Sequence, residues 1–304
     1  PKFWDKTSLS LFSILLFPIG LIFKLLTFLK RISSKKYQFS IPIICIGNIY
    51  LGGTGKTPLS LELFTILKDL NMKPAFIRKK YLAFEDETNL QMQTGSLYEN
   101  KKRSIAIKNA IQNKINVAIL DDGFQDFSIK KDFSIICFNE KQWIGNGLII
   151  PAGPLREGLS ALKRADCIVI NGQKNKDIEN KILSKNEKIK IFYSSFKPQN
   201  IDEFKNKKVI AFAGIGNPEN FFDLLMENKL NILETIKFPD HHKYSEKELE
   251  NLLNKIKDND SILLTTEKDY FRISEKNKRK IKFLKINVDI ENKNQFIEEV
   301  KKII

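Results

Sequence analysis

The sequence is poor in cysteine and histidine. Its three cysteines, Cys45, Cys137 and Cys167, stand apart inside apolar runs and form no C-x-x-C pair. This spacing is typical of buried strand residues, and it offers neither a disulfide framework nor a zinc site. The two histidines are adjacent, at His241 and His242, so histidine chemistry is confined to one place in the chain. The composition favours a reducing compartment.

Acidic residues are also outnumbered by basic ones. The 304 residues carry 51 Lys and Arg against 36 Asp and Glu, which gives a net charge of +15. Such a charge attracts anionic partners: a membrane surface, nucleic acid or a phosphorylated substrate. The excess is mostly lysine spread along the chain, and we find no stripe of basic and aromatic residues of the kind that binds nucleic acid. With 42% hydrophobic residues, the chain is long enough for two domains of average size.

The longest apolar run lies near the N-terminus, over residues 9–29, and is interrupted by Pro18, Gly20 and Lys24. It is just long enough to cross a bilayer, but the internal lysine, the Pro-Gly break and the flanking basic residues favour a helix lying in the membrane interface. No small-residue cleavage site follows it, which argues against a signal peptide. A buried core helix is the alternative. We predict a membrane-associated helix within residues 1–31, either peripheral or acting as a single-helix anchor.

A phosphate-binding loop follows this run. Residues 43–46 form an apolar stretch of buried-strand type, and the sequence GGTGKT leads from it into a helical pattern. Lys56 is expected to reach the β and γ phosphates of a nucleotide, and Thr57 to bind Mg²⁺. The common G-x-x-x-x-G-K-[ST] pattern has glycine where this chain has Tyr50. The predicted nucleotide-binding residues of the loop are Asn48, Gly52, Gly53, Thr54, Gly55, Lys56 and Thr57.

Two carboxylates end a second apolar strand pattern, at Asp121 and Asp122. An acid at the end of a strand completes the Mg²⁺ shell in many phosphate-loop proteins, so we predict that both bind this metal. A GTPase would show D-x-x-G and N/T-K-x-D motifs. Here Gly123 directly follows Asp122, and Lys268 is adjacent to Asp269. The pattern therefore favours transfer of a phosphoryl group from ATP over GTP switching.

Several further segments occur in an order that resembles one family, the tetraacyldisaccharide 4′-kinases. They are GNIYLGGTGKTP, DDGFQD, GNGLIIPAGPLREGLSALKRAD, AFAGIGNPENFF, FPDHHKYS and TTEKDYFR. The resemblance covers nearly the whole chain. It implies phosphorylation of the 4′-hydroxyl of an acylated disaccharide 1-phosphate lipid in lipid A biosynthesis, with ATP and Mg²⁺. The implied place is the cytoplasmic face of the bacterial inner membrane, with that membrane surface as a partner and no nucleic acid.

The resemblance also implies an α/β fold with two domains and an active site in the cleft between them. We predict a P-loop NTPase-like parallel sheet domain over residues 32–195 and a smaller α/β domain over residues 196–304. A short β linker is expected near residues 192–198.

Catalytic residues follow from the same resemblance. It implies that Asp86 is the base and that His241 supports it across the interdomain cleft, while Gln125, Arg156 and Glu157 lie near the nucleotide. Arginine suits the charge on a transferring phosphoryl group, and an exposed Arg-Glu pair is the alternative. Ser245 and Glu248 form an S-x-x-E capping box, so both histidines are expected on the entry loop of a helix.

One segment departs from the family pattern. Where relatives carry S-R-G-Y-G, this chain has the residues Ile-Arg-Lys-Lys-Tyr at 77–81, and only four residues separate Tyr81 from Asp86. Either Asp86 reaches the cleft on a shortened loop, or the activity is altered or reduced. The residues alone leave two alternatives open: a soluble P-loop kinase or ATP-dependent ligase acting on a small metabolite, and a non-catalytic or nucleic-acid-binding ATPase.

Overall fold

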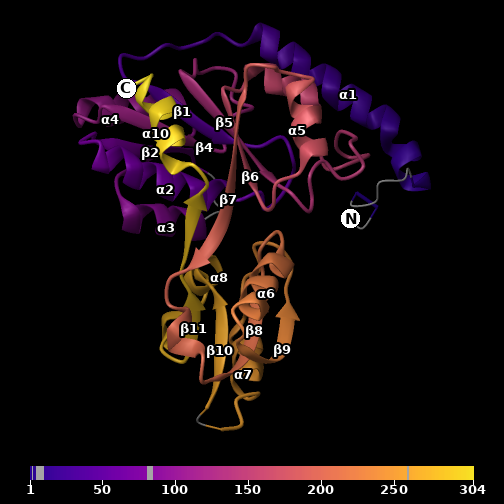
Figure 1. The fold of residues 1–304 in the computed structure, drawn as a ribbon, viewed down its shortest axis with the longest axis vertical. Coiled ribbons are helices and arrows are strands. Elements are labelled where there is room, and N and C mark those ends of the chain that lie inside the picture. The colour runs from indigo at the N-terminus through magenta and orange to yellow at the C-terminus, as the bar shows by residue number, and fades with distance from the viewer. Residues whose placement is uncertain (2, 5–9, 81–84, 259) are drawn as a thin grey trace. The chain divides into compact units, whose positions relative to one another are not determined.

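The chain divides into two compact units in a computed structural model that describes residues 1, 3–4, 10–80, 85–258 and 260–304, without the side chains of residues 85–87 (Figure 1). Unit 1 consists of Pro1–Lys80, Gly95–Ser195 and Asp289–Ile304, and unit 2 consists of Tyr81–Thr94 and Phe196–Val288. The predicted β linker lies in one strand, Lys190–Pro198, and the division falls within it. The predicted boundaries differ from these units in three segments: residues 1–31 and 289–304 group with unit 1, and residues 81–94 group with unit 2.

Unit 1 is built on an eight-stranded sheet with the order β12-β7-β6-β5-β1-β4-β2-β3. The six pairings from β7 to β3 are all parallel. Its strands are β1 (Ile43–Gly47), β2 (Pro74–Lys79), β3 (Leu97–Asn100), β4 (Val117–Asp121), β5 (Phe133–Asn139), β6 (Cys167–Asn171), β7 (Lys190–Pro198) and β12 (Ile286–Ile290). Its helices are α1 (Leu11–Ser33), α2 (Lys56–Asp69), α4 (Arg103–Gln112), α5 (Lys176–Leu183) and α10 (Lys293–Lys301), with a 3₁₀ turn over Leu159–Arg164.

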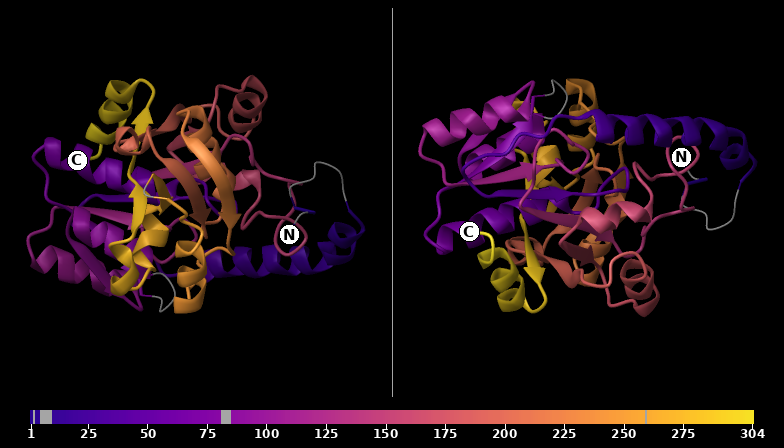
Figure 2. Two further views of the ribbon diagram at one scale, coloured as in Figure 1. Left: turned by 90° about the horizontal axis from the view of Figure 1, so that it is seen from below. Right: turned by 90° about the horizontal axis from the view of Figure 1, so that it is seen from above.

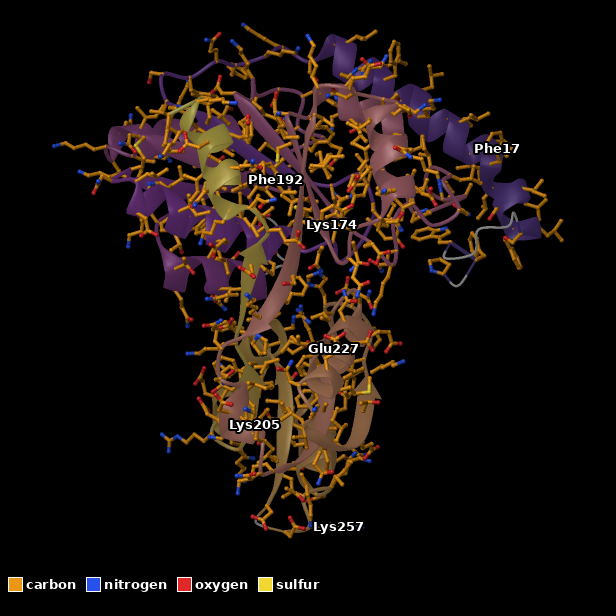
Figure 3. The ribbon with its side chains drawn as sticks, in the orientation of Figure 1. Phe17, Lys174, Phe192, Lys205, Glu227 and Lys257 are labelled. Carbon is orange, nitrogen blue, oxygen red and sulfur yellow. The ribbon has the colours of Figure 1, made fainter. Side chains whose placement is uncertain are left out.

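The central strands of this sheet read as continuous apolar runs because both of their faces are covered. Every residue of β1, β4 and β5 is buried. The three cysteines are buried with them, as the sequence predicts, and burial raises the pKa of the Cys45 and Cys137 thiols to about 12. In β7, the neighbour of the edge strand β12, Phe192 (labelled in Figure 3) packs edge-on against Phe296 of α10. This contact fixes the C-terminal helix to unit 1.

Unit 2 contains a four-stranded parallel sheet with the order β11-β10-β8-β9. Alternate residues of β8, one of its two central strands, face opposite sides of the sheet. Val209, Ala211 and Ala213 join one apolar cluster, and Ile210 and Phe212 join the other. The strands are β8 (Lys208–Ala213), β9 (Asn231–Lys237), β10 (Ser261–Thr266) and β11 (Ile281–Leu284). The helices are α3 (Glu85–Thr94), α6 (Pro218–Glu227), α7 (Glu246–Leu253), α8 (Glu267–Phe271) and α9 (Glu275–Lys278), with a 3₁₀ turn over Ile201–Phe204. The α/β class with mostly parallel strands is therefore confirmed.

Helix α1 lies along the outside of unit 1 (Figure 2). Most of its large apolar side chains are exposed. It is long and apolar enough to cross a membrane, yet only 11% of its most apolar window is buried. Phe17, labelled in Figure 3, is one of the exposed residues. A core helix would hide these side chains, so the alternative of a buried helix is wrong.

The buried face of α1 is a narrow seam of small residues. Ser13 Oγ accepts a hydrogen bond from Asn146 Nδ2 at 3.1 Å, and Gly20 lies so close to the Ile149 carbonyl that a Cβ there would stand 3.0 Å from its oxygen. Before the helix, Trp4 Nε1 donates to the Pro151 carbonyl at 3.0 Å. The helix is thus attached to the loop of residues 145–155, which leads into Arg156.

Candidate functional site

The phosphate loop connects β1 to α2. Gly55 adopts a left-handed conformation with φ of 89°, and α2 begins at the next residue, Lys56. At the other end of the loop, a Cβ on Gly47 would stand 2.5 Å from the Phe124 Cβ, so only glycine fits there. The N-terminus of α2 therefore follows the glycine-rich turn directly, and helix N-termini attract anions such as phosphate groups.

Two side chains shape the loop from inside. Asn48 is fully buried, and its Nδ2 donates to Thr54 Oγ1 at 3.0 Å and to the Gly52 carbonyl at 3.3 Å. Tyr50, which replaces the usual glycine, is buried and forms an isolated antiparallel bridge with Leu155. The departure at Tyr50 therefore serves packing of the loop rather than disrupting it.

The segment that leads into Arg156 forms backbone hydrogen bonds with the phosphate loop. The Leu51 amide donates to the Pro154 carbonyl at 2.8 Å, and the Arg156 amide donates to the Ile49 carbonyl at 2.7 Å. These backbone bonds hold the PAGPLRE segment against the phosphate loop. They bring Arg156, more than 100 positions later in the chain, to the start of α2.

The two predicted metal acids lie at the C-terminal end of β4, next to the phosphate loop. β1 and β4 are parallel neighbours, and Ile46 is in register with Asp121. Asp121 is buried, as is Thr57 in the first turn of α2. Parallel neighbours end at the same sheet edge, so the sequence order alone is enough to predict this meeting of loop and acids.

Asp122 lies between two cations. Arg156 Nη1 donates to Oδ1 at 2.8 Å and to Oδ2 at 3.0 Å, and Lys56 Nζ lies 3.9 Å from Oδ1. Desolvation opposes ionisation of this carboxyl, but the positive charges of Lys56 and Arg156 outweigh it and hold the pKa of Asp122 below its ordinary value. The carboxylate thus keeps both cations at the mouth of the phosphate loop.

Gln125 and Glu157 contact each other next to the phosphate loop. Gln125 Nε2 donates to the Asn48 carbonyl at 2.9 Å and to Glu157 Oε1 at 3.3 Å, and Glu157 Oε2 accepts from Arg164 Nη2 at 2.7 Å. The Arg164 guanidinium also lies over the Phe124 ring, 4.5 Å from its centroid. Gln125 and Glu157 therefore support the loop through its backbone, within reach of the predicted nucleotide residues.

Arg103 and Arg164 are site residues that the sequence analysis did not identify. Arg103 Nη2 donates to the carbonyls of Asp121 and Asp122 at 3.1 and 3.0 Å, and its Nη1 donates to Asp126 Oδ2 at 3.2 Å. Arg103 therefore fixes the backbone of the turn that carries Asp121 and Asp122. No motif surrounds it, and the only signal is an arginine where this chain otherwise prefers lysine.

Unit 2 holds the two histidines on the entry loop of α7, as predicted. Ser245 and Glu248 form the expected capping box at the helix start. His241 has a left-handed φ of 57°, and its amide donates to the Gly214 carbonyl at 3.0 Å. His242 instead stacks on Phe238 and contacts Glu248 Oε1 at 3.1 Å. The two adjacent rings therefore have different partners.

Asp86 lies in the first turn of α3, so the expectation of a shortened loop is wrong at this position. Its side chain lies outside the described residues. Helix α3 packs against α8 and belongs to unit 2, as His241 does. The expectation that Asp86 and His241 come from different domains is therefore also wrong, because the two residues share one compact unit.

A buried carboxylate organises the same region of unit 2. Asp269 is fully buried and accepts hydrogen bonds from Tyr244 Oη at 2.9 Å, Thr266 Oγ1 at 2.7 Å and the Gly214 amide at 3.1 Å. Its Oδ1 also accepts from Arg272 Nη1 at 3.0 Å. Asp269 is a fixed anion around which the histidine loop is arranged.

Comparison with known proteins gives a consistent family. A family model described as tetraacyldisaccharide-1-P 4′-kinase matches residues 12–304. A tetraacyldisaccharide 4′-kinase of Pelagibacter ubique is 41% identical over 307 residues, which is 100% of this chain and 97% of that protein. The enzyme of the same name from Parvibaculum lavamentivorans is 33% identical over 295 residues, covering 90% of this chain and 86% of that one.

A solved structure shares the fold. LpxK from Aquifex aeolicus, crystallised in complex with ATP, superposes with a TM-score of 0.74 at 23% identity. The match covers 96% of this chain and 99% of that one.

Proposed function

The chain belongs to the tetraacyldisaccharide 4′-kinase family and is a kinase of lipid A biosynthesis, and from this premise we propose how its residues divide the reaction. The γ-phosphoryl group of ATP is transferred to the 4′-hydroxyl of a tetraacyldisaccharide 1-phosphate. The observation that carries the proposal is the convergence of Lys56 and Arg156 on Asp122 at the start of α2. Two cations at a helix N-terminus suit a polyphosphate.

Unit 1 supplies the ATP side of the reaction. Backbone amides of Gly52, Gly53, Thr54 and Gly55 and of the first turn of α2 would hold the phosphates, with Asn48 keeping the loop in shape. Lys56 and Arg156 would stabilise charge on the transferring group, since both stand at the same carboxylate. Gln125 and Glu157 would position Arg156 and the loop.

The oxygen donors at this site fit Mg²⁺. Thr57 offers a hydroxyl at the start of α2, and Asp121 and Asp122 offer carboxylates at the end of the neighbouring strand. Mg²⁺ prefers such hard oxygen ligands and is bound through one or two carboxylates together with substrate phosphates. When bound, the ion would neutralise phosphate charge at the transferring group.

Unit 2 supplies the acceptor side. A sugar hydroxyl must lose its proton as the phosphoryl group arrives, and a carboxylate is a suitable acceptor for it. We assign this role to Asp86 and a supporting role to His241, on the family resemblance of these positions. The packing of α3 against α8 supports the pairing, because α8 contains Asp269, whose hydrogen bonds also hold the histidine loop.

A transfer assay tests the proposed function. The purified protein is incubated with γ-labelled ATP, Mg²⁺ and the tetraacyldisaccharide 1-phosphate in detergent micelles, and label is expected in the lipid. The matched control is the same lipid already phosphorylated at the 4′ position, which offers no acceptor. Label that appears only in small soluble acceptors, or in no acceptor while a related kinase labels the lipid, would exclude the proposal.

The membrane surface is the second proposed partner. The exposed face of α1 consists of large apolar side chains, and Lys30 and Arg31 lie in its last turn. Such a helix enters the head-group region of an anionic membrane with its apolar face. Because a lipid kinase must reach a substrate whose acyl chains are held in a bilayer, we propose that α1 keeps the protein on the cytoplasmic face of the inner membrane.

Negative charge introduced on the exposed apolar face of α1 should release the protein from membranes without unfolding it. In the double variant Phe17→Glu/Leu25→Glu, binding to anionic phospholipid vesicles is expected to fall about 100-fold, since each large apolar side chain contributes roughly 1.5–3 kcal/mol when buried. Both residues are exposed, so the melting temperature should stay within about 2 °C of the parent value. Vesicle sedimentation and thermal unfolding measure the two effects.

The control places the same charge on an exposed leucine elsewhere. Leu233→Glu changes a residue of β9 that is 55% exposed. It should leave vesicle binding unchanged. Undiminished binding of the α1 double variant, or loss of its fold, would contradict the membrane role of this helix.

A further inference from the structure

We propose that Arg272 is a positioning residue that fixes His241 as the neutral tautomer with its proton on Nε2. The proposal deepens the proposed function, because it states which form of His241 supports the base. It rests on the contacts of unit 2 alone, and these can be measured without any turnover.

The contact between the two side chains defines the tautomer. Arg272 Nη2 lies 3.3 Å from His241 Nδ1. A guanidinium stays protonated and has only donors, so a hydrogen bond between these atoms requires a lone pair on Nδ1. The proton of a neutral imidazole must then reside on Nε2.

Arg272 itself is held in place from two sides. Its Nη1 donates to Asp269 Oδ1 at 3.0 Å and to the Gly214 carbonyl at 2.7 Å. The Asp269 carboxylate is fully buried and is already fixed by Tyr244, and the side chain of Arg272 is only 10% exposed. A guanidinium with so many fixed partners keeps its Nη2 directed at the histidine.

The Gly214 carbonyl connects the arginine to the histidine backbone. It accepts both from Arg272 Nη1 at 2.7 Å and from the His241 amide at 3.0 Å. A Cβ at position 214 would stand 3.0 Å from the Tyr244 hydroxyl and 3.2 Å from Asp269 Oδ1, so the close approach favours glycine. One oxygen thus sets the distance between the guanidinium and the ring.

This arrangement determines what His241 can do. With Nδ1 occupied, the ring presents an N–H group at Nε2, which donates to a carboxylate and cannot accept the proton of a sugar hydroxyl. The Oδ1 atom of the adjacent Asp240 lies 3.8 Å from Nε2. The proton of the acceptor hydroxyl is therefore left to a carboxylate, with His241 orienting it as a donor.

Nitrogen NMR of the two histidines tests the tautomer directly. At pH 8, the spectrum of the unmodified protein should show His241 with a protonated Nε2 and an unprotonated Nδ1. The chain contains only His241 and His242, so His242, which contacts Glu248, serves as an internal reference. A protonated Nδ1 on His241 would overturn the proposal without any variant.

Arg272→Leu extends the test to catalysis. Without the guanidinium, His241 should become a mixture of tautomers while the His242 signals stay in place. We expect kcat to fall about tenfold or more, since loss of a tautomer-fixing partner can cost far more than this, and KM for ATP to change little. Arg272→Lys retains a charge that only donates and should restore much of the single-tautomer signal.

Arg279→Leu is the matched control, because Arg279 is an exposed arginine of the same unit. It should change neither the histidine spectrum nor kcat. An Arg272→Leu protein with the parent tautomer and the parent kcat would overturn the role of Arg272. Failure of the proposed function would look different: the parent protein would not phosphorylate the lipid, whatever its histidine spectrum.

Discussion

Replacement of Lys56 by alanine should lower kcat for lipid phosphorylation by about 10²- to 10³-fold. Lys56 opens α2, and its ammonium group stands 3.9 Å from Asp122 beside the guanidinium of Arg156. A preorganised donor directed at charge that develops in the transition state contributes about this much to kcat. Steady-state kinetics with saturating lipid and ATP measure the loss.

The fold should survive this substitution. The Lys56 ammonium lies 3.9 Å from Asp122 Oδ1, which is longer than a hydrogen bond, and alanine is a better helix former than lysine. Thermal unfolding of Lys56→Ala should therefore match the parent within a few degrees. Lys68→Ala is the matched control, since Lys68 is an exposed residue in the last turn of the same helix. A kcat within threefold of the parent in Lys56→Ala would mean that the transferring phosphoryl group does not bind at this loop.

Local patterns predicted most of the nucleotide side of unit 1. A continuous apolar run, a glycine-rich turn and a helical pattern define β1, the loop and α2 almost to the residue. The Asp121–Asp122 pair follows a second such run, and parallel pairing brings it beside the loop. These features are predictable because each depends on neighbours within a few positions of the chain, and the capping box at Ser245 belongs to the same class.

Contacts between distant residues were not predictable in the same way. Arg103 binds the acidic turn 18 positions away, and Arg164 combines an ion pair with ring stacking. No periodicity encodes such partners. The choice of side chain does carry a signal: the basic residues are mostly lysine, yet arginine stands at positions 103, 156, 164 and 272, where planar, multidentate contacts are made. In a lysine-rich chain, an arginine that is buried or half-buried is a candidate for a structural or catalytic contact.

The segment around Asp86 is a case in which a local element was predicted wrongly. Its short spacing from Tyr81 suggested a loop, because the family motif that precedes the base is missing from this chain. The residues instead begin α3, which packs against α8. Glu and Gln are good helix formers, and acidic residues in a first turn suit the helix dipole, so the local propensity for α3 was present. The prediction of a loop rested on the missing family motif and did not take this helix propensity into account.

Asp86→Asn should lower kcat by about 10²- to 10⁴-fold, the range that general base catalysis contributes. Asparagine matches the shape of the carboxylic side chain but cannot accept the proton of the sugar hydroxyl. Binding depends on other groups, so KM for ATP should stay within a few-fold of the parent value. Single-turnover measurements with saturating lipid isolate the chemical step.

The neighbouring acids decide whether Asp86 is the base. Glu85, Asp86 and Glu87 are consecutive acids in α3, and the family resemblance assigns the role of base to Asp86 alone. Glu85→Gln and Glu87→Gln should therefore retain kcat within about threefold, while Asp86→Asn does not. If the large loss falls on Glu85 or Glu87 instead, the altered segment has changed the register of the base. If none of the three variants loses activity, the proton is taken by a group outside α3, and the assignment from the family fails although the kinase activity stands.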